Sequence, residues 1–204
     1  MEILLLIAAF VLGLLSFFEP CTIATHTLFA VRLHHDPLNR RALALAQLVL
    51  SRIGLLALIF GMAAAIGLAA LSAQAAMLML AVIGLVYLVS RKVYLPVPHL
   101  EFFRLVPRHA DWPQGLKLGL TLPACTLPLV LIVGMLSALT QQPLLAVLAG
   151  GVFAVMFSLP TVWGSVHGLG ADARAFLGLS AALSPYLTTA LLWGAALFIW
   201  QTGH

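Results

Sequence analysis

Two long stretches of this chain contain no acidic or basic side chain, and they constrain the fold more than any other feature. They cover residues 53–71 and 118–139. As a helix, each is long enough to cross a hydrocarbon core of roughly 30 Å. Because lipid offers the backbone no hydrogen-bond partner, an apolar segment that spans it must be helical. Only 8% of the residues are charged, against about 25% in soluble domains, so we predict an all-α integral membrane protein.

Apolar stretches recur six times along the 204 residues. We predict spans at 3–33, 42–71, 74–91, 115–139, 143–166 and 175–200. The first lacks a basic start and stays apolar beyond residue 20, so we expect it to remain in the mature protein rather than be cleaved as a signal peptide. The expected organisation is one membrane domain over 1–204, with a three-helix repeat in 1–95, a cytoplasmic connecting loop at 96–111 and a second three-helix repeat in 112–204.

All ten Lys and Arg residues lie near three of the predicted connections. They are Arg32, Arg40, Arg41 and Arg52 around the first, Arg91, Lys92, Arg104, Arg108 and Lys117 around the third, and Arg174 around the fifth. Because loops rich in Lys and Arg are retained in the cytoplasm, we expect both termini outside. The net charge of +4 is then a consequence of topology, and no nucleic-acid partner is expected.

The chain has two cysteines, and they occupy matching places in the two predicted halves. Cys21 follows Pro20, while Pro123 and Pro128 flank Cys125, so each cysteine lies beside residues that break helices. An odd number of spans in each half turns the second half upside down relative to the first. In such folds the functional site forms where the first helix of each half is broken. We therefore predict a 3+3 inverted repeat with a broken first helix in each half.

The stretch SFFEPCTIATH, residues 16–26, is where the first helix is expected to break. Ser16 and Glu19 have the spacing of a capping box, and Pro20 suits a first helical turn. Thr121 would cap the corresponding helix of the second half. Glu19 is also the only acid well inside a predicted span, which makes it a functional candidate. It is expected either to cap the restarted helix or to move the proton that thiol–disulfide exchange requires.

Four explanations of the cysteines stay open from the residues alone. Cysteine is often a small packing residue. If the halves are related as predicted, the two cysteines could come within the roughly 7 Å Cα separation that a disulfide needs and carry two electrons without a cofactor. The same fold also serves secondary transporters of ions or small metabolites, in which Glu19 and His26 would bind or couple. A quinone-linked disulfide-forming enzyme is a weaker alternative, because it usually needs two cysteine pairs.

His26 lies five residues beyond Cys21, about 140° around an ideal helix. The two residues therefore do not share a helix face, and they lack the further ligands of known Cys/His metal sites. A hydrogen bond from His26 to a neighbouring helix is the favoured prediction, and no metal is expected.

The motifs SFFEPCT and LPACTLP resemble the two Pro-and-Cys motifs of the CcdA family of cytochrome c biogenesis proteins, whose fold is shared by the transmembrane domain of the DsbD thiol–disulfide reductases. The resemblance extends over the whole chain, through its length, six spans, inverted repeat and outside termini. Ala24 stands where the family usually has a second proline, and Ala124 precedes the second cysteine. The chain thus resembles a divergent branch of the family.

The resemblance implies that Cys21 and Cys125 are the redox pair of a thiol–disulfide oxidoreductase in a bacterial inner (cytoplasmic) membrane. It implies reduction by cytoplasmic thioredoxin and reoxidation by an extracytoplasmic thioredoxin-like protein. The basic loops suit docking of an acidic thioredoxin, with Arg104 and Arg108 as candidates. Apocytochrome cysteines, a copper-centre assembly factor and a periplasmic oxidoreductase remain open as the final acceptor.

Overall fold

A computed structural model describes residues 2–66, 73–90, 100–105, 112–140, 142–168 and 170–202. Over these residues the secondary structure is helical apart from one pair of two-residue strands, and short turns connect the helices. The helices are α1 (Glu2–Phe17), α2 (Pro20–His34), α3 (Leu38–Ile66), α4 (Ala73–Ser90), α5 (Gln114–Gly119), α6 (Leu127–Thr140), α7 (Pro143–His167) and α8 (Ala171–Thr202). The short elements are β1 (Leu100–Glu101), η2 (Phe102–Leu105), β2 (Thr121–Leu122) and η4 (Ala124–Thr126), where η marks a 3-10 helix.

Three helices, α3, α7 and α8, are each long and apolar enough to cross a membrane, and α1 with α2 makes a fourth if this bent pair is one span. The segment Ala124–Thr140 is a shorter apolar helix. The helices lie close to the six predicted segments. The structure thus confirms an all-α protein with three to four candidate spans among its described residues, and six spans are not shown.

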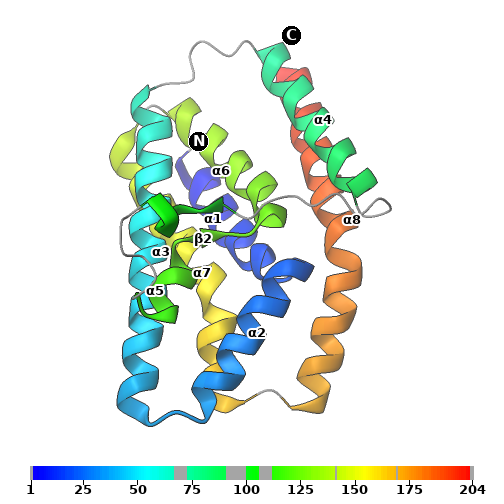
Figure 1. Ribbon diagram of the computed structural model, residues 1–204. Helices are drawn as coiled ribbons and strands as arrows, with labels where there is room; N and C mark the ends of the chain where they lie inside the picture. The colour runs from blue at the N-terminus through cyan, green and yellow to red at the C-terminus, as the bar shows by residue number, and fades with distance from the viewer. Residues whose placement is uncertain are drawn as a thin grey trace.

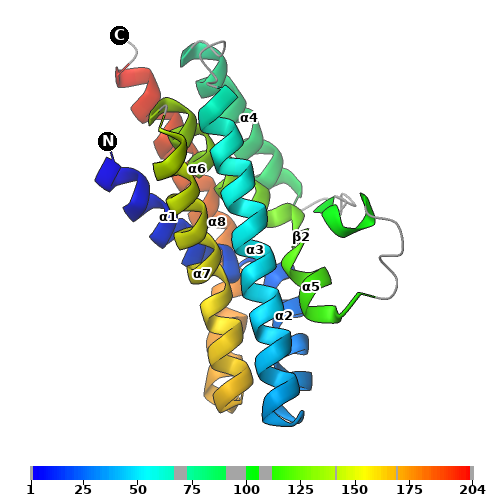
Figure 2. The same cartoon turned by 90° about the vertical axis from the view of Figure 1, so that its left-hand side faces the viewer.

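The helices form one bundle in which α3 and α7 lie side by side and α4 pairs with α8 (Figures 1 and 2). A Cβ on Gly150 of α7 would lie 2.7 Å from the carbonyl oxygen of Leu56 on α3, so the two backbones touch where glycine stands. The buried core includes Phe60, Phe153 and Phe157. Both chain ends point toward the end of the bundle opposite to the turn between α2 and α3 (Figure 1).

The first break separates α1 from α2 by a bend of 73°. The ring of Pro20 disfavours a helical conformation for the residue before it, and Glu19 is accordingly extended, with φ −67° and ψ 139°. Helix α2 then begins at Pro20, whose missing N–H is no loss in a first turn. The predicted capping box is wrong: Ser16 Oγ donates to the Leu12 carbonyl within α1, and Glu19 makes no side-chain capping bond.

The second break lies between α5 and α6, where the chain runs through β2 and η4. Pro123 is extended, with φ −58° and ψ 141°, and precedes η4. Pro128 lies in the first turn of α6, where proline is tolerated. The predicted cap by Thr121 is wrong, because its hydroxyl donates instead to the Lys117 carbonyl, at 2.8 Å.

The predicted 96–111 loop contributes β1, which pairs antiparallel with β2 so that Glu101 lies opposite Thr121. Several residues named in the sequence analysis lie outside the described residues: Arg91, Lys92, Arg108 and most of the 96–111 loop.

Candidate functional site: a disulfide between two helix breaks

A disulfide joins Cys21 to Cys125 across 104 residues of sequence, with 6.7 Å between their Cα atoms. Cys21 is the second residue of α2, and Cys125 is in η4, so each cysteine follows a break in its helix. Cys125 is buried, whereas Cys21 is half-buried. The predicted meeting of the two cysteines is therefore confirmed, and Cys21 is the more accessible partner.

The residue after each cysteine is a fully buried threonine. Thr126 closes the η4 turn, because its hydroxyl donates to the Pro123 carbonyl at 2.8 Å. Thr22 follows Cys21 in the first turn of α2, but its buried hydroxyl makes no hydrogen bond there. Each cysteine thus lies at the start of a helical segment, between a proline before it and a buried threonine after it, and only Thr126 closes its turn with a hydrogen bond.

Glu19 is fully buried two residues before Cys21. Its Oε1 accepts a hydrogen bond of 2.6 Å from the hydroxyl of Thr188, which is on α8. A carboxyl group inside an apolar bundle is costly unless it is hydrogen-bonded. The side chain that was expected to cap α2 instead ties the first break to α8, which runs beside α2.

A second polar cluster is built around Arg52, which is fully buried in α3. Its Nη1 donates to Ser158 Oγ, and its Nη2 donates both to the Leu118 carbonyl and to His26 Nε2, each at 3.1 Å. The guanidinium carbon lies 4.1 Å from the centre of the Phe157 ring. Among the described residues, no carboxylate forms an ion pair with Arg52, so neutral acceptors and a ring face hold this charge.

His26 is fully buried and completes this cluster. Because a guanidinium can only donate, Nε2 of His26 must accept and carries no proton. The proton is then on Nδ1, which donates to Thr161 Oγ1 at 2.7 Å. The hydrogen bonds therefore assign a neutral imidazole in one tautomer. The predicted interhelical hydrogen bond of His26 is confirmed, and it reaches α3 and α7 together.

Arg52 is the residue that the sequence analysis placed incorrectly. It was grouped with the loop cations, yet it lies 14 residues into α3, which begins at Leu38. At 1.5 Å per residue this is about 21 Å along the helix. An arginine so far inside an apolar segment is expensive and signals a function or a specific partner, and that signal was present in the sequence.

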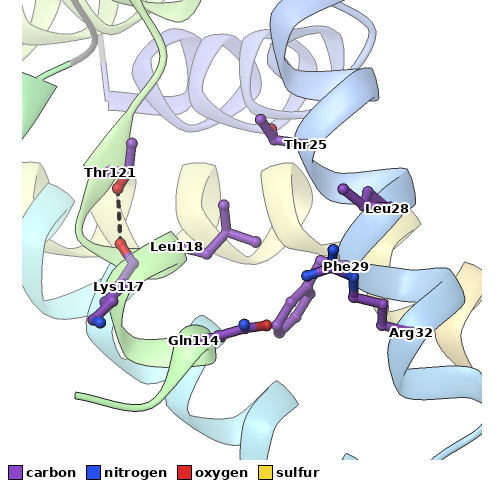
Figure 3. Close-up of a pocket in the computed structure, with 8 residues that line it drawn as sticks. All are labelled: Thr25, Leu28, Phe29, Arg32, Gln114, Lys117, Leu118 and Thr121. Carbon is purple, nitrogen blue, oxygen red and sulfur yellow. Dashed lines mark hydrogen bonds between the residues drawn. The ribbon is translucent and has the colours of Figure 1, made fainter. Parts of the chain in front are cut away.

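An open pocket of about 240 Å³ lies between α2 and α5 (Figure 3). Its lining residues are Thr25, Leu28, Phe29, Arg32, Gln114, Lys117, Leu118 and Thr121. Thr25 lies one turn beyond Cys21 and donates to its carbonyl at 3.1 Å, and Thr121 lies four residues before Cys125. The pocket thus borders both segments that carry the disulfide. The side chain of Arg32 folds back toward Phe29 at its rim (Figure 3).

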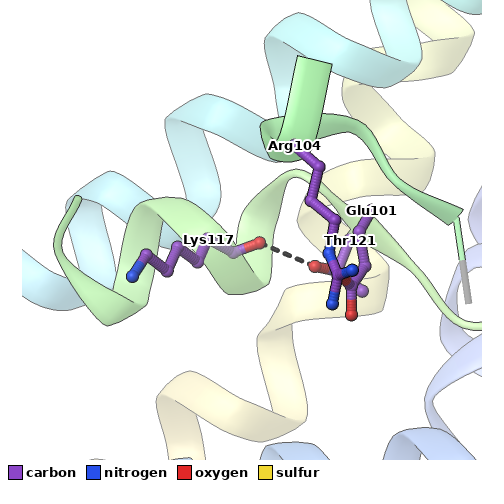
Figure 4. A network of polar contacts seen from close by, with 4 residues as sticks. All are labelled: Glu101, Arg104, Lys117 and Thr121. Atoms are coloured by element: carbon purple, nitrogen blue, oxygen red, sulfur yellow. Dashed lines mark hydrogen bonds and ion pairs between the residues drawn. The ribbon is translucent and has the colours of Figure 1, made fainter. Parts of the chain in front are cut away.

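Arg104, one of the two cations proposed for docking, lies beside this region in η2. Its Nε forms an ion pair with Glu101, and the side chain is 69% exposed. Figure 4 shows this pair next to the hydrogen bond between Thr121 and the Lys117 carbonyl. Because Glu101 offsets its charge, Arg104 offers less net attraction to an acidic partner than the sequence suggested.

No group of three His, Cys, Asp or Glu side chains that could hold a metal ion occurs in the part of the chain that the structure describes. Comparison of the chain with family models, with curated proteins and with solved structures gives no match.

Proposed function

We propose that this protein is a transmembrane thiol–disulfide reductase of six spans, built as a 3+3 inverted repeat. It carries reducing equivalents from cytoplasmic thioredoxin to an extracytoplasmic thioredoxin-like acceptor. The observation that carries this proposal is the single disulfide between the two helix breaks, in a chain that is apolar enough for a membrane. Residues on the two sides of this bond come from the two predicted halves, as a site at the centre of an inverted repeat requires.

The exchange conserves atoms and electrons in two steps. A thiolate of reduced thioredoxin attacks one sulfur of the Cys21–Cys125 bond, forms a mixed disulfide and releases the other cysteine as a thiolate, which takes up a proton. The second thioredoxin thiol then breaks the mixed disulfide. Thioredoxin leaves oxidised, and the pair holds two thiols, two electrons and two protons. Reversal of these steps against the disulfide of the outer acceptor completes one cycle.

Cys21 is the sulfur that we expect the incoming thiolate to attack, because it is the more exposed of the two. The pocket between α2 and α5 borders Thr25, one turn beyond Cys21, although Cys21 itself does not line it. At about 240 Å³ it is smaller than the roughly 300–1,000 Å³ of typical small-molecule sites. A metabolite of typical size therefore does not fit this pocket.

The surroundings of Glu19 and His26 also favour the reductase. In a transporter these side chains would face the substrate. Each is fully buried with a side-chain partner from another helix, Thr188 for Glu19 and Thr161 for His26. Glu19 remains two residues from Cys21, where it can supply a proton to the Cys21 thiolate when the mixed disulfide breaks.

Trapping of the thiol state tests the proposal. Native membranes holding the protein are acid-quenched before and after addition of reduced thioredoxin, and free thiols are then alkylated with a maleimide that retards the chain on a gel. We expect both cysteines to be protected before the addition and both to be alkylated after it. The Cys21→Ser and Cys125→Ser variants calibrate the one-thiol band. A bond that stays protected under active thioredoxin but is reduced by dithiothreitol once the protein is denatured would show a structural disulfide and refute the proposal.

A further inference from the structure

We infer that Arg52 is a positioning residue that clamps together the two chain segments carrying Cys21 and Cys125, and so sets how readily their disulfide is reduced. This inference rests on the proposed function, because it concerns the same cysteine pair. It gives the buried guanidinium of Arg52 a role other than that of a loop cation that sets the orientation of the chain in the membrane.

The clamp is visible in the two hydrogen bonds made by one nitrogen atom. Nη2 of Arg52 bonds His26 Nε2 and the Leu118 carbonyl, each at 3.1 Å. His26 lies on α2, five residues beyond Cys21, and Leu118 lies on α5, seven residues before Cys125. One donor thus connects the segment of the first cysteine to the segment of the second, in parallel with the disulfide.

The guanidinium is itself held in a fixed position. Ser158 Oγ accepts from Nη1 and the Phe157 ring covers one face, and both residues belong to α7, which carries no cysteine. Helix α5 is seated on α3 at Gly119, where an added Cβ would lie 2.7 Å from the Leu48 carbonyl oxygen. The Arg52 side chain therefore joins the two cysteine-carrying segments to α3 and α7, which pack closely against each other.

The chemical consequence follows from effective concentration. Reduction of the disulfide leaves two thiols whose chance of meeting again depends on how closely their segments are held. When the clamp is intact, the thiols stay close and oxidation of the pair is favoured. Removal of the clamp lets the segments separate, which stabilises the reduced pair relative to the disulfide. A lysine at this position keeps the charge but loses the planar fork that spans two acceptors.

The test is a redox titration of the full chain in native membranes against reduced and oxidised dithiothreitol. In this equilibrium dithiothreitol supplies two electrons and two protons and becomes its cyclic disulfide. We expect Arg52→Met to shift the equilibrium about tenfold toward the reduced pair, equivalent to about 30 mV for a two-electron couple. Arg52→Lys is expected to lie between Arg52→Met and the wild type.

Leu56→Ala is the matched control, because Leu56 is fully buried one turn further along α3 and belongs to the apolar core. It should lower thermal stability without moving the redox equilibrium. If Arg52→Met does not insert and fold, Arg52→Lys decides, since it retains the buried charge. The clamp would be overturned if Leu56→Ala shifted the redox equilibrium as far as the Arg52 variants do. It would also be overturned if the Arg52 variants had the same redox equilibrium as the wild type. A wild-type bond that dithiothreitol never opens in the folded protein would instead refute the proposed function.

Discussion

Gly119 seats α5 on α3, and its replacement by alanine tests whether this contact holds the second cysteine segment in place. A Cβ there would lie 2.7 Å from the Leu48 carbonyl oxygen, whereas ordinary van der Waals contact begins at 3.4 Å. The Ser51 hydroxyl lies closer still, and even when it rotates away helix α5 must move by about 0.7 Å to clear the Leu48 carbonyl. If Arg52 does not follow, its 3.1 Å bond to the Leu118 carbonyl lengthens to about 3.8 Å, too long for a hydrogen bond.

The expected cost combines two effects. Overpacking of a well-packed contact costs about 1–3 kcal/mol, and loss of a hydrogen bond from a charged donor costs about 1.5–3 kcal/mol. A small shift of the Arg52 side chain can restore part of the lost hydrogen bond. We therefore expect Gly119→Ala to lower the free energy of unfolding by about 2–4 kcal/mol.

The assay is unfolding in mixed detergent micelles, followed by the loss of helical circular dichroism as denaturing detergent is added. Gly54→Ala is the control, because Gly54 lies on α3 with nothing within 4 Å of an added Cβ. Alanine is favoured over glycine inside a helix by up to about 1 kcal/mol, so this variant should be as stable as the wild type or more stable. If Gly119→Ala proved as stable as Gly54→Ala, the close contact of α5 with α3 would be refuted.

Three further predictions concern the disulfide and the buried polar groups around it. Glu19→Gln keeps an acceptor for the Thr188 hydroxyl but cannot carry a proton; we expect it to fold and to slow exchange with reduced thioredoxin about 100-fold, and an unchanged rate at every pH in stopped-flow measurements would exclude the proton relay. Cys21→Ser and Cys125→Ser should each abolish reduction of the outer acceptor, assayed by its thiol state in cells, whereas full reduction in either variant would leave only a structural role for the disulfide. Thr161→Val removes the acceptor of the His26 Nδ1 proton and should lower the free energy of unfolding by about 1–3 kcal/mol; detergent-unfolding curves identical to those of the wild type would contradict a stabilising hydrogen bond between His26 and Thr161.

The candidate site was only partly accessible from the sequence. The cysteines and their prolines were identifiable, because a proline acts on its own residue and the one before it. The pairing itself depended on the two halves folding together, and the structure provides it. Glu19 was correctly singled out as a buried acid, yet its partner, Thr188, lies 169 residues away and has no local sequence signal.

Capping residues show why local patterns can fail. Ser16 and Glu19 fit a capping box, but the sequence offered two possible helix starts, and Pro20 selected the later one by forcing Glu19 out of the helix. Ser16 then became an interior residue of α1 and bonded the carbonyl four residues before it. A four-residue motif shows that a helix could start at a given residue. It does not show whether the packing of the whole bundle favours that start or a neighbouring one.

The sequence alone determined the class of this protein, the approximate helix positions and the two breaks, since apolar runs and prolines act over short distances along the chain. The tertiary structure alone decided the fate of Arg52. Whether an arginine inside an apolar helix faces lipid, a loop or a buried acceptor depends on which helices pack against it. Here α2, α5 and α7 provide three neutral acceptors and a ring face from distant parts of the chain, so long-range packing turned an apparent loop cation into the centre of a buried cluster.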